Sequence, residues 1–153
     1  MPSGRLESIN ASPGGVPKTA VLVGIITAHG LTGDHQDDQR YHGGRDRAIL
    51  VFSLDVIRAL QSEGHPIGAG TTGENFTVSG LDWGLIGRGR ELIVGEVRLL
   101  VTNYASPCET IRGSFLERDF MRISQKLHPG WSRLCTRVIE GGTVRPGDPV
   151  DLI

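Results

Sequence analysis

The sequence has no run of about 18 apolar residues, so we expect no transmembrane helix. It also has no marked excess of one charge. Its 16 basic and 17 acidic side chains leave a formal net charge of −1, which argues against a nucleic-acid groove or an anionic membrane surface as partner. The first residues, MPSGRLESINASPGGVPK, lack the apolar core of a secretory signal, and we therefore expect a cytoplasmic protein.

Cysteine is scarce and glycine is abundant. Cys108 and Cys135 could form at most one disulfide, and reduced thiols are expected in a chain without a secretory signal. The 22 glycines follow no fixed period and lie between short apolar runs, as in a small β-barrel or sandwich with many tight turns. A length of 153 residues is enough for one domain with a real core.

The order of the expected elements favours a mostly β fold with two helices. Residues 1–17 are expected to be an arm or loop, and residues 28–47 a long polar loop. Helices are expected over 53–64, with Ser53 as N-cap, and over 115–130, where apolar residues repeat at helical spacing. Strands are expected over 19–27, 48–52, 75–79, 91–105 with a break at Gly95, 131–139 and 150–153. This is not the regular strand–helix alternation of a doubly wound sheet.

Two polar segments could bind a ligand. Gly68–Gly73 matches G-x-G-x-x-G, but a helix precedes it and a strand follows it, the reverse of a dinucleotide-binding motif. Its open backbone N–H groups would still suit an anionic oxygen. His29, His35 and His42 share the long loop with several aspartates, so a metal site and a solvated loop both remain open.

The two cysteines lie in different contexts. Cys135 falls within the apolar strand WSRLCTRVI and is predicted to be a small buried residue. Cys108 follows Pro107, which ends the preceding strand, and polar residues come after it. A thiol at a strand end can be a metal ligand or nucleophile if its pKa is lowered, or it can simply fill space. From the local sequence both interpretations remain open.

Six segments in the same order resemble the MOSC domain family, the domains homologous to the C-terminal part of molybdenum cofactor sulfurase. They are SINASPGGVPK (8–18), GLTGDHQ (30–36), HGGRDRA (42–48), GTTGENFTVSGLD (70–82), SPC (106–108) and GWSRLCTRVIEGGTVRPGD (130–148). The chain is most similar to the small stand-alone type that resembles bacterial hydroxylaminopurine-resistance proteins. The resemblance implies a mostly β, MOSC-type β-barrel with two or three short helices, as one domain over 1–153 with residues 1–7 as a flexible arm.

The resemblance also implies a site for the molybdenum cofactor, a pterin dithiolene that carries a phosphate. Cys108 would ligate molybdenum or carry sulfur as a persulfide, and a soft thiolate suits both roles. The implied cofactor-binding residues are Lys18, His42, Gly43, Gly44, Arg45, Asp46, Arg47, Gly73, Glu74 and Asn75. The chain departs from the family pattern Q-P-R-x-P-C at one cation, because Ala105 stands where the arginine is expected.

Three functions remain open from this resemblance. The protein could reduce N-hydroxylated compounds as a molybdenum enzyme, it could be a sulfur carrier or cofactor-binding module, or it could be a barrel that has lost the cofactor. The chain carries no iron–sulfur cysteine set and no PLP-lysine domain. A separate redox protein or a cysteine desulfurase would therefore supply the electrons or the sulfur.

Overall fold

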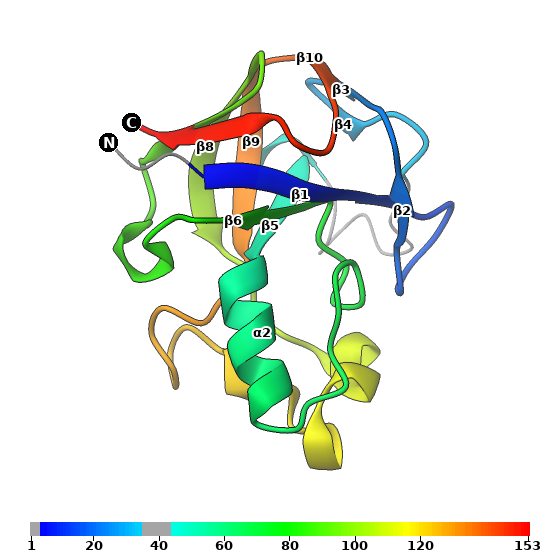
Figure 1. The fold of residues 1–153 in the computed structure, drawn as a ribbon, viewed down its shortest axis with the longest axis vertical. Coiled ribbons are helices and arrows are strands. Elements are labelled where there is room, and N and C mark those ends of the chain that lie inside the picture. The colour runs from blue at the N-terminus through cyan, green and yellow to red at the C-terminus, as the bar shows by residue number, and fades with distance from the viewer. Residues whose placement is uncertain (1–3, 35–43) are drawn as a thin grey trace.

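Seven strands close into a β-barrel in the part of the chain that the computed structural model describes, residues 4–34 and 44–153 (Figure 1). Around the barrel the order is β11, β7, β8, β9, β5, β6 and β1, and pairing of β1 with β11 completes the ring. The bounds are β1 (Gly4–Ala11), β5 (Ile49–Ser53), β6 (Phe76–Ser79), β7 (Glu91–Val94), β8 (Val97–Tyr104), β9 (Leu134–Glu140) and β11 (Pro149–Leu152). The prediction of a mostly β barrel is confirmed.

Helix α2 (Leu54–Ser62) connects the parallel pair of barrel strands, β5 and β6. A ring with an odd number of strands cannot alternate direction throughout, so one neighbouring pair must be parallel, and a parallel pair needs a crossover connection. The predicted helix over 53–64 is confirmed. Ser53 caps it by accepting a hydrogen bond from the Val56 backbone N–H at 3.2 Å, and Ile57 and Leu60 are buried.

A smaller sheet lies beside the barrel and corrects one expectation. It contains β3 (Gly24–Thr27), β4 (Gly30–Leu31) and β10 (Gly142–Val144), while β2 (Thr19–Val21) pairs with the outer part of β1. The single strand predicted over 19–27 is therefore two strands in two sheets. The chain crosses between the sheets at Leu22 and Val23, which are exposed.

The N-terminal segment is the second correction, because Gly4–Ala11 form a barrel strand and not an arm or loop. Strand β1 pairs with three neighbours, β2, β6 and β11, and its register shifts between Leu6 and Ser8 where it faces β6. Such an irregularity breaks the strict two-residue alternation by which a half-buried strand is found in a sequence. Leu6 and Ile9 are nevertheless fully buried in the core.

The predicted helix over 115–130 is wrong. In its place are short 3₁₀ helices at Leu116–Arg118 and Phe120–Ile123, which follow another at Glu109–Ser114. Glu117 and Arg118 have positive φ, and the Leu116 backbone N–H donates to His65 Nδ1 at 3.0 Å instead of to a helical carbonyl. Phe115 and Ile123 still reach the core. Short 3₁₀ turns thus satisfy the apolar spacing that also fits an α-helix.

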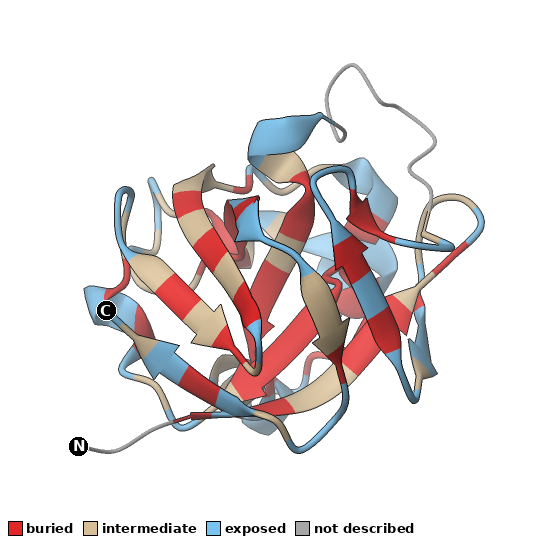
Figure 2. Ribbon diagram, turned by 90° about the horizontal axis from the view of Figure 1, so that it is seen from above, coloured by how far each residue is buried: buried red, intermediate tan, exposed pale blue. Residues whose placement is uncertain are grey.

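The barrel interior is apolar. Buried, half-buried and exposed residues form bands along the strands (Figure 2), as expected when alternate side chains point inward. The largest fully buried apolar side chains are Phe52, Phe76, Leu6, Ile9, Ile49, Ile57, Leu60, Leu92, Leu99, Ile123 and Leu134. They join the barrel and α2 into one core.

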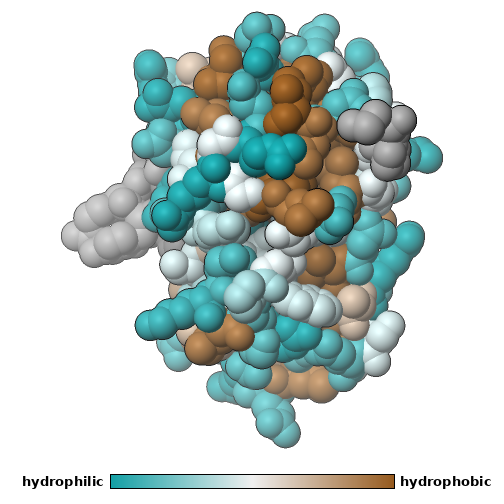
Figure 3. Space-filling model, turned by 90° about the vertical axis from the view of Figure 1, so that its left-hand side faces the viewer, coloured by the Kyte–Doolittle hydropathy of each residue, from teal (hydrophilic) through white to brown (hydrophobic). Residues whose placement is uncertain are grey.

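The surface is mixed in character. On the face shown in Figure 3, apolar side chains are interspersed with hydrophilic ones. The exposed large apolar residues come from separate segments, such as Leu22, Leu85 and Leu127. None of the helices in residues 4–34 and 44–153 is both long enough and apolar enough to cross a bilayer.

Candidate functional site

A cavity of about 130 Å³ opens where several turns meet the ends of β8 and β9. The turn at Gly15–Lys18, the turn at Thr72–Gly73, the 3₁₀ helix Arg45–Arg47 and the start of Glu109–Ser114 all contribute lining residues. Segments far apart in the sequence therefore build one site, as is common where loops meet at one end of a rigid barrel.

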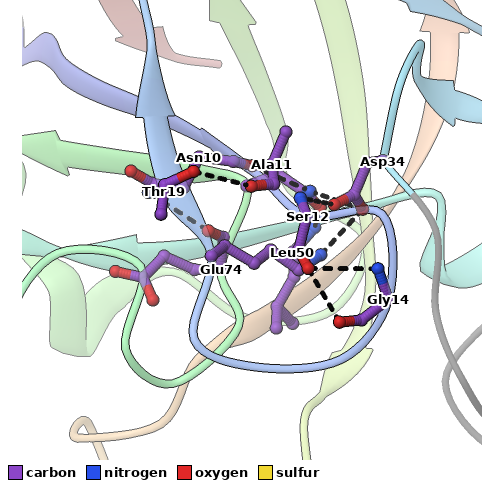
Figure 4. Close-up of polar contacts among 10 residues, drawn as sticks. Asn10, Ala11, Ser12, Gly14, Thr19, Asp34, Leu50 and Glu74 are labelled. Carbon is purple, nitrogen blue, oxygen red and sulfur yellow. Dashed lines mark hydrogen bonds and ion pairs between the residues drawn. The ribbon is translucent and has the colours of Figure 1, made fainter.

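The lining carries positive charge. Lys18, Arg47 and Arg133 line the cavity, and no acidic side chain does so among the described residues. The Lys18 ammonium is already paired, because its Nζ lies 2.7 Å from Asp34 Oδ2 and both side chains are buried. Asp34 also accepts from the Ser12 backbone N–H at 2.9 Å (Figure 4) and from Asn75 Nδ2 at 3.0 Å. This network holds Lys18 in the cavity wall.

Arg133 is the most unusual of the three cations, since only 6% of its surface is exposed. Its Nη1 donates to the Thr72 carbonyl at 2.7 Å and its Nη2 to the Ser106 carbonyl at 3.3 Å. Its buried Nε has no partner within the described part of the chain. Burial lowers the pKa of the guanidinium, while the charges of Glu74 and of the two cysteines oppose that shift. An arginine remains charged at neutral pH, so the cavity contains a buried positive charge.

Cys108 lies at the rim of this cavity. Strand β8 ends at Tyr104, and the thiol follows Pro107 on an extended residue before the next 3₁₀ helix. The side chain is half-buried, with Sγ 2.8 Å from the hydroxyl of Thr110, a cavity-lining residue. Cys108 itself is not among the described lining residues, but Ser106 and Thr110 on either side of it are. The thiol is thus accessible beside a cationic cavity.

A second hollow, of about 560 Å³, adjoins the first. The two share Ala105 and Ser106, and the second also contacts Pro107, so the segment that leads to Cys108 borders both. Arg88 and Lys126 add further positive charge, and no described lining residue is acidic. Typical ligand sites occupy roughly 300–1,000 Å³. The two hollows together reach that range.

Those cofactor-binding residues proposed from the sequence that the structure describes fall into three groups. Lys18, Arg47 and Gly73 line the cavity. Gly44, Arg45 and Asp46 are exposed and are not among its described lining residues, and Asp46 forms an ion pair with Arg137 at 2.9 Å. His42 and Gly43 lie outside the described residues. Roles in cofactor binding stay predictions for all of them.

Glu74 and Asn75 form the third group, since both are fully buried in internal hydrogen bonds and neither is a described lining residue. Glu74 accepts from the Gly70 N–H, the Thr72 hydroxyl and the Thr77 hydroxyl, each at 3.0 Å. Burial raises the pKa of the Glu74 carboxyl, and these hydrogen bonds oppose that shift. Asn75 accepts from the Leu50 N–H at 2.9 Å. Both residues support the wall of the cavity from behind.

Sequence reasoning missed Arg133 as a site residue. The signal in the sequence was the place of Arg133 directly before the apolar residues of β9. A charged side chain that becomes buried beside such a run needs a specific partner, which makes it a candidate site residue. Cys135, predicted to be buried, is 2% exposed and lines the cavity, and burial raises the pKa of its thiol. No cluster of three or more histidine, cysteine or acidic side chains that could bind a metal occurs in residues 4–34 and 44–153.

The family model of the MOSC domain matches residues 38–151, most of the chain. The chain belongs to the MOSC domain family. This MOSC chain is 28% identical to the protein YiiM of Escherichia coli over 155 residues, which cover 95% of this chain and 68% of YiiM. It is also 28% identical to the uncharacterized protein YflK of Bacillus subtilis over 137 residues, and it spans 60% of that relative's length.

Solved structures share the fold. The crystal structure of YiiM from Geobacillus stearothermophilus superposes with a TM-score of 0.72 at 23% identity, covering 98% of this chain and 75% of that one. The YuaD protein from Bacillus subtilis gives a TM-score of 0.75 at 18% identity, covering 99% and 98% of the two chains. At these identities the likeness establishes the barrel fold of the MOSC chain.

Proposed function

We propose that this MOSC domain binds a molybdenum cofactor beside Cys108, across the cavity and the larger hollow that adjoins it. The observation that carries the proposal is the combination of an accessible thiol with a cavity lined by Lys18, Arg47 and Arg133. A thiolate is a soft ligand suited to a thiophilic metal, and the guanidinium groups suit the phosphate of the pterin. The buried Nε of Arg133 has no described partner, so the residues present fit an anionic group that would accept a hydrogen bond there.

In this proposal each residue of the chain has a separate task. Cys108 would ligate the metal, Arg133 and Arg47 would bind anionic oxygens, and the Gly73 turn would allow close approach of the ligand to the backbone. When bound, the cofactor would supply a metal that changes oxidation state by two electrons. Reduction of N-hydroxylated compounds is the reaction that we propose, with a separate redox protein as electron donor.

Metal analysis tests the proposal most directly. The chain would be produced in a host that synthesises the cofactor, and molybdenum would be measured by mass spectrometry in the wild type, Cys108→Ser and Cys135→Ser. We expect near-stoichiometric molybdenum in the wild type and in Cys135→Ser, and little in Cys108→Ser. Absence of molybdenum from the wild type, or full retention in Cys108→Ser, would overturn the role assigned to Cys108.

The position of Cys108 also favours a second function, sulfur carriage. Its thiol is half-buried and is not among the described residues that line the cavity, so a donor protein could reach it. In this function a cysteine desulfurase persulfide transfers its outer sulfur to the Cys108 thiolate, which forms a new persulfide and releases the donor's thiol without net oxidation. Mass spectrometry after incubation with a desulfurase should find one added sulfur on Cys108. An adduct that persists in Cys108→Ser would exclude this function.

A further inference from the structure

Arg133 lies directly opposite Ala105 where strands β8 and β9 pair, although the two residues are far apart in the sequence. Strands β8 and β9 pair Tyr104 with Leu134, and the ladder continues as the Ala105 N–H donates to the Arg133 carbonyl at 3.0 Å. Ala105 and Arg133 are therefore direct cross-strand neighbours. Side chains of such neighbours lie on the same face of a sheet, with Cβ atoms about 5 Å apart.

This pairing matters because Ala105 stands where the resemblance to the small stand-alone MOSC proteins implies an arginine. Ala105 and Arg133 both line the cavity. An arginine at position 133 therefore places its guanidinium at the same wall of the cavity as an arginine at position 105 would.

The surroundings of Arg133 leave its charge without a directly bonded carboxylate among the described residues. Its two printed acceptors are neutral carbonyls, those of Thr72 and Ser106. Glu74 forms no described hydrogen bond with Arg133: its charge acts through space, and Thr72 lies between them, with its hydroxyl donating to Glu74 and its carbonyl accepting from Arg133. A buried ion without a directly bonded counter-charge is costly, and an anionic ligand would remove that cost.

We propose that Arg133 is the principal anion-binding residue of the cavity, where it binds a phosphate-sized oxyanion and replaces the cation missing at Ala105. Lys18 and Arg47 line the same cavity, and its volume of about 130 Å³ suits a compact group better than a whole pterin. The inference rests on the proposed function only in assigning this oxyanion to the phosphate of the cofactor. Binding of a free oxyanion can be tested without the cofactor.

The test is a titration of the cofactor-free chain with inorganic phosphate, followed by NMR chemical shifts and by calorimetry. We expect Arg133→Met to weaken phosphate binding by about 10- to 100-fold, the range that one hydrogen bond to a charged group represents. Arg133→Lys should give intermediate affinity, because lysine keeps the charge and loses the planar fork. The matched control is Arg98→Met, since Arg98 is paired with Glu91 at 2.6 Å and is not a described lining residue. Its phosphate affinity should equal that of the wild type.

A swap variant separates a lost ligand contact from a disturbed fold. Arg133→Ala combined with Ala105→Arg moves the guanidinium to the other strand, and it should restore phosphate affinity that Arg133→Ala alone loses. The inference is overturned if wild-type chain binds no phosphate, if folded Arg133→Met or Arg133→Lys binds as the wild type does, or if Arg98→Met weakens binding equally. It is also overturned if the swap restores folding without affinity.

The two proposals fail in different ways. Phosphate binding that depends on Arg133, together with absence of molybdenum from the wild type, would reject the cofactor and keep the oxyanion site. Molybdenum in the wild type, together with phosphate binding that ignores Arg133, would keep the cofactor and reject the present inference.

Discussion

Replacing Lys18 by methionine removes one partner of a buried ion pair and keeps most of the side-chain volume. The Lys18 and Asp34 side chains are 3% and 7% exposed, and their charged atoms lie 2.7 Å apart. Removal of one member of such a pair costs about 3–5 kcal/mol, because it leaves the other charge buried without its partner. Asp34 would keep hydrogen bonds from the Ser12 N–H and Asn75 Nδ2. We therefore expect the lower end of the range, a loss of about 3 kcal/mol.

The assay is urea unfolding at neutral pH, followed by tryptophan fluorescence, on Lys18→Met, Asp34→Ala and the double variant. The double-mutant cycle should give a coupling energy of about 2 kcal/mol between the two residues. Lys126→Met is the matched control, because Lys126 is exposed and forms no ion pair that is described. Its stability should lie within about 0.5 kcal/mol of the wild type.

The outcome decides how Lys18 serves the site. A large coupling energy means that its charge is neutralised by Asp34 and that its main task is to hold the cavity wall. A loss of less than about 1 kcal/mol for Lys18→Met would match an exposed pair. Such a result would contradict the burial of the Lys18–Asp34 pair, and Lys18 would then be a cation available to a ligand.

Three further predictions concern single residues. In the folded protein, iodoacetamide should modify the half-buried Cys108 quickly and leave Cys135 unmodified. The Cys135 side chain is only 2% exposed, and burial raises the pKa of its thiol. Modification of both cysteines at comparable rates would contradict the placement of β9. Burial raises the pKa of Glu74, so its stabilising contribution is present below the ordinary value of 4.5 and is lost as pH rises through the folded-state pKa. In urea unfolding between about pH 5 and pH 7, the free energy of unfolding of Glu74→Gln should therefore rise relative to that of the wild type, by at most about 1.4 kcal/mol per pH unit. A difference between the two proteins that does not change with pH would contradict the raised pKa of Glu74. Gly30→Ala should destabilise the fold by more than about 3 kcal/mol, because φ is +111° and a Cβ would overlap the Ala48 carbonyl oxygen. Gly33→Ala, where φ is +88° and no atom lies nearby, should cost only about 1 kcal/mol. Equal thermal stabilities of the two variants would contradict the close approach at Gly30.

Several elements follow from local sequence alone. Helix α2 begins at a serine cap and repeats its apolar residues at helical spacing, and both signals act within a few residues. Strands β7 and β8 are correctly separated at Gly95, where φ is +56°. Strand β8 ends at Tyr104, close to the strand end predicted before Pro107, since proline cannot donate to a ladder and the pairing cannot extend through it.

The predictions for residues 115–130 and for the N-terminal segment are wrong because long-range contacts override the local pattern of apolar residues there. Residues 115–130 have helical apolar spacing, but the contact of Leu116 with His65 and the positive φ of Glu117 exclude an α-helix there. Strand β1 is too polar and irregular to be found by alternation, yet three partner strands hold it in the barrel. Such pairings lie outside any local window of sequence.

The mostly β class, helix α2, the thiol at a strand end and the resemblance to MOSC domains can all be read from the amino-acid sequence. The charges that surround the neighbouring cavity cannot, because they are brought together only by the folded barrel. It pairs Lys18 with Asp34, turns Glu74 and Asn75 inward, and places Arg133 across the ladder from Ala105. The physical reason is register, because the strand that lies opposite a residue, and the face to which its side chain points, depend on how distant strands pair around the closed barrel.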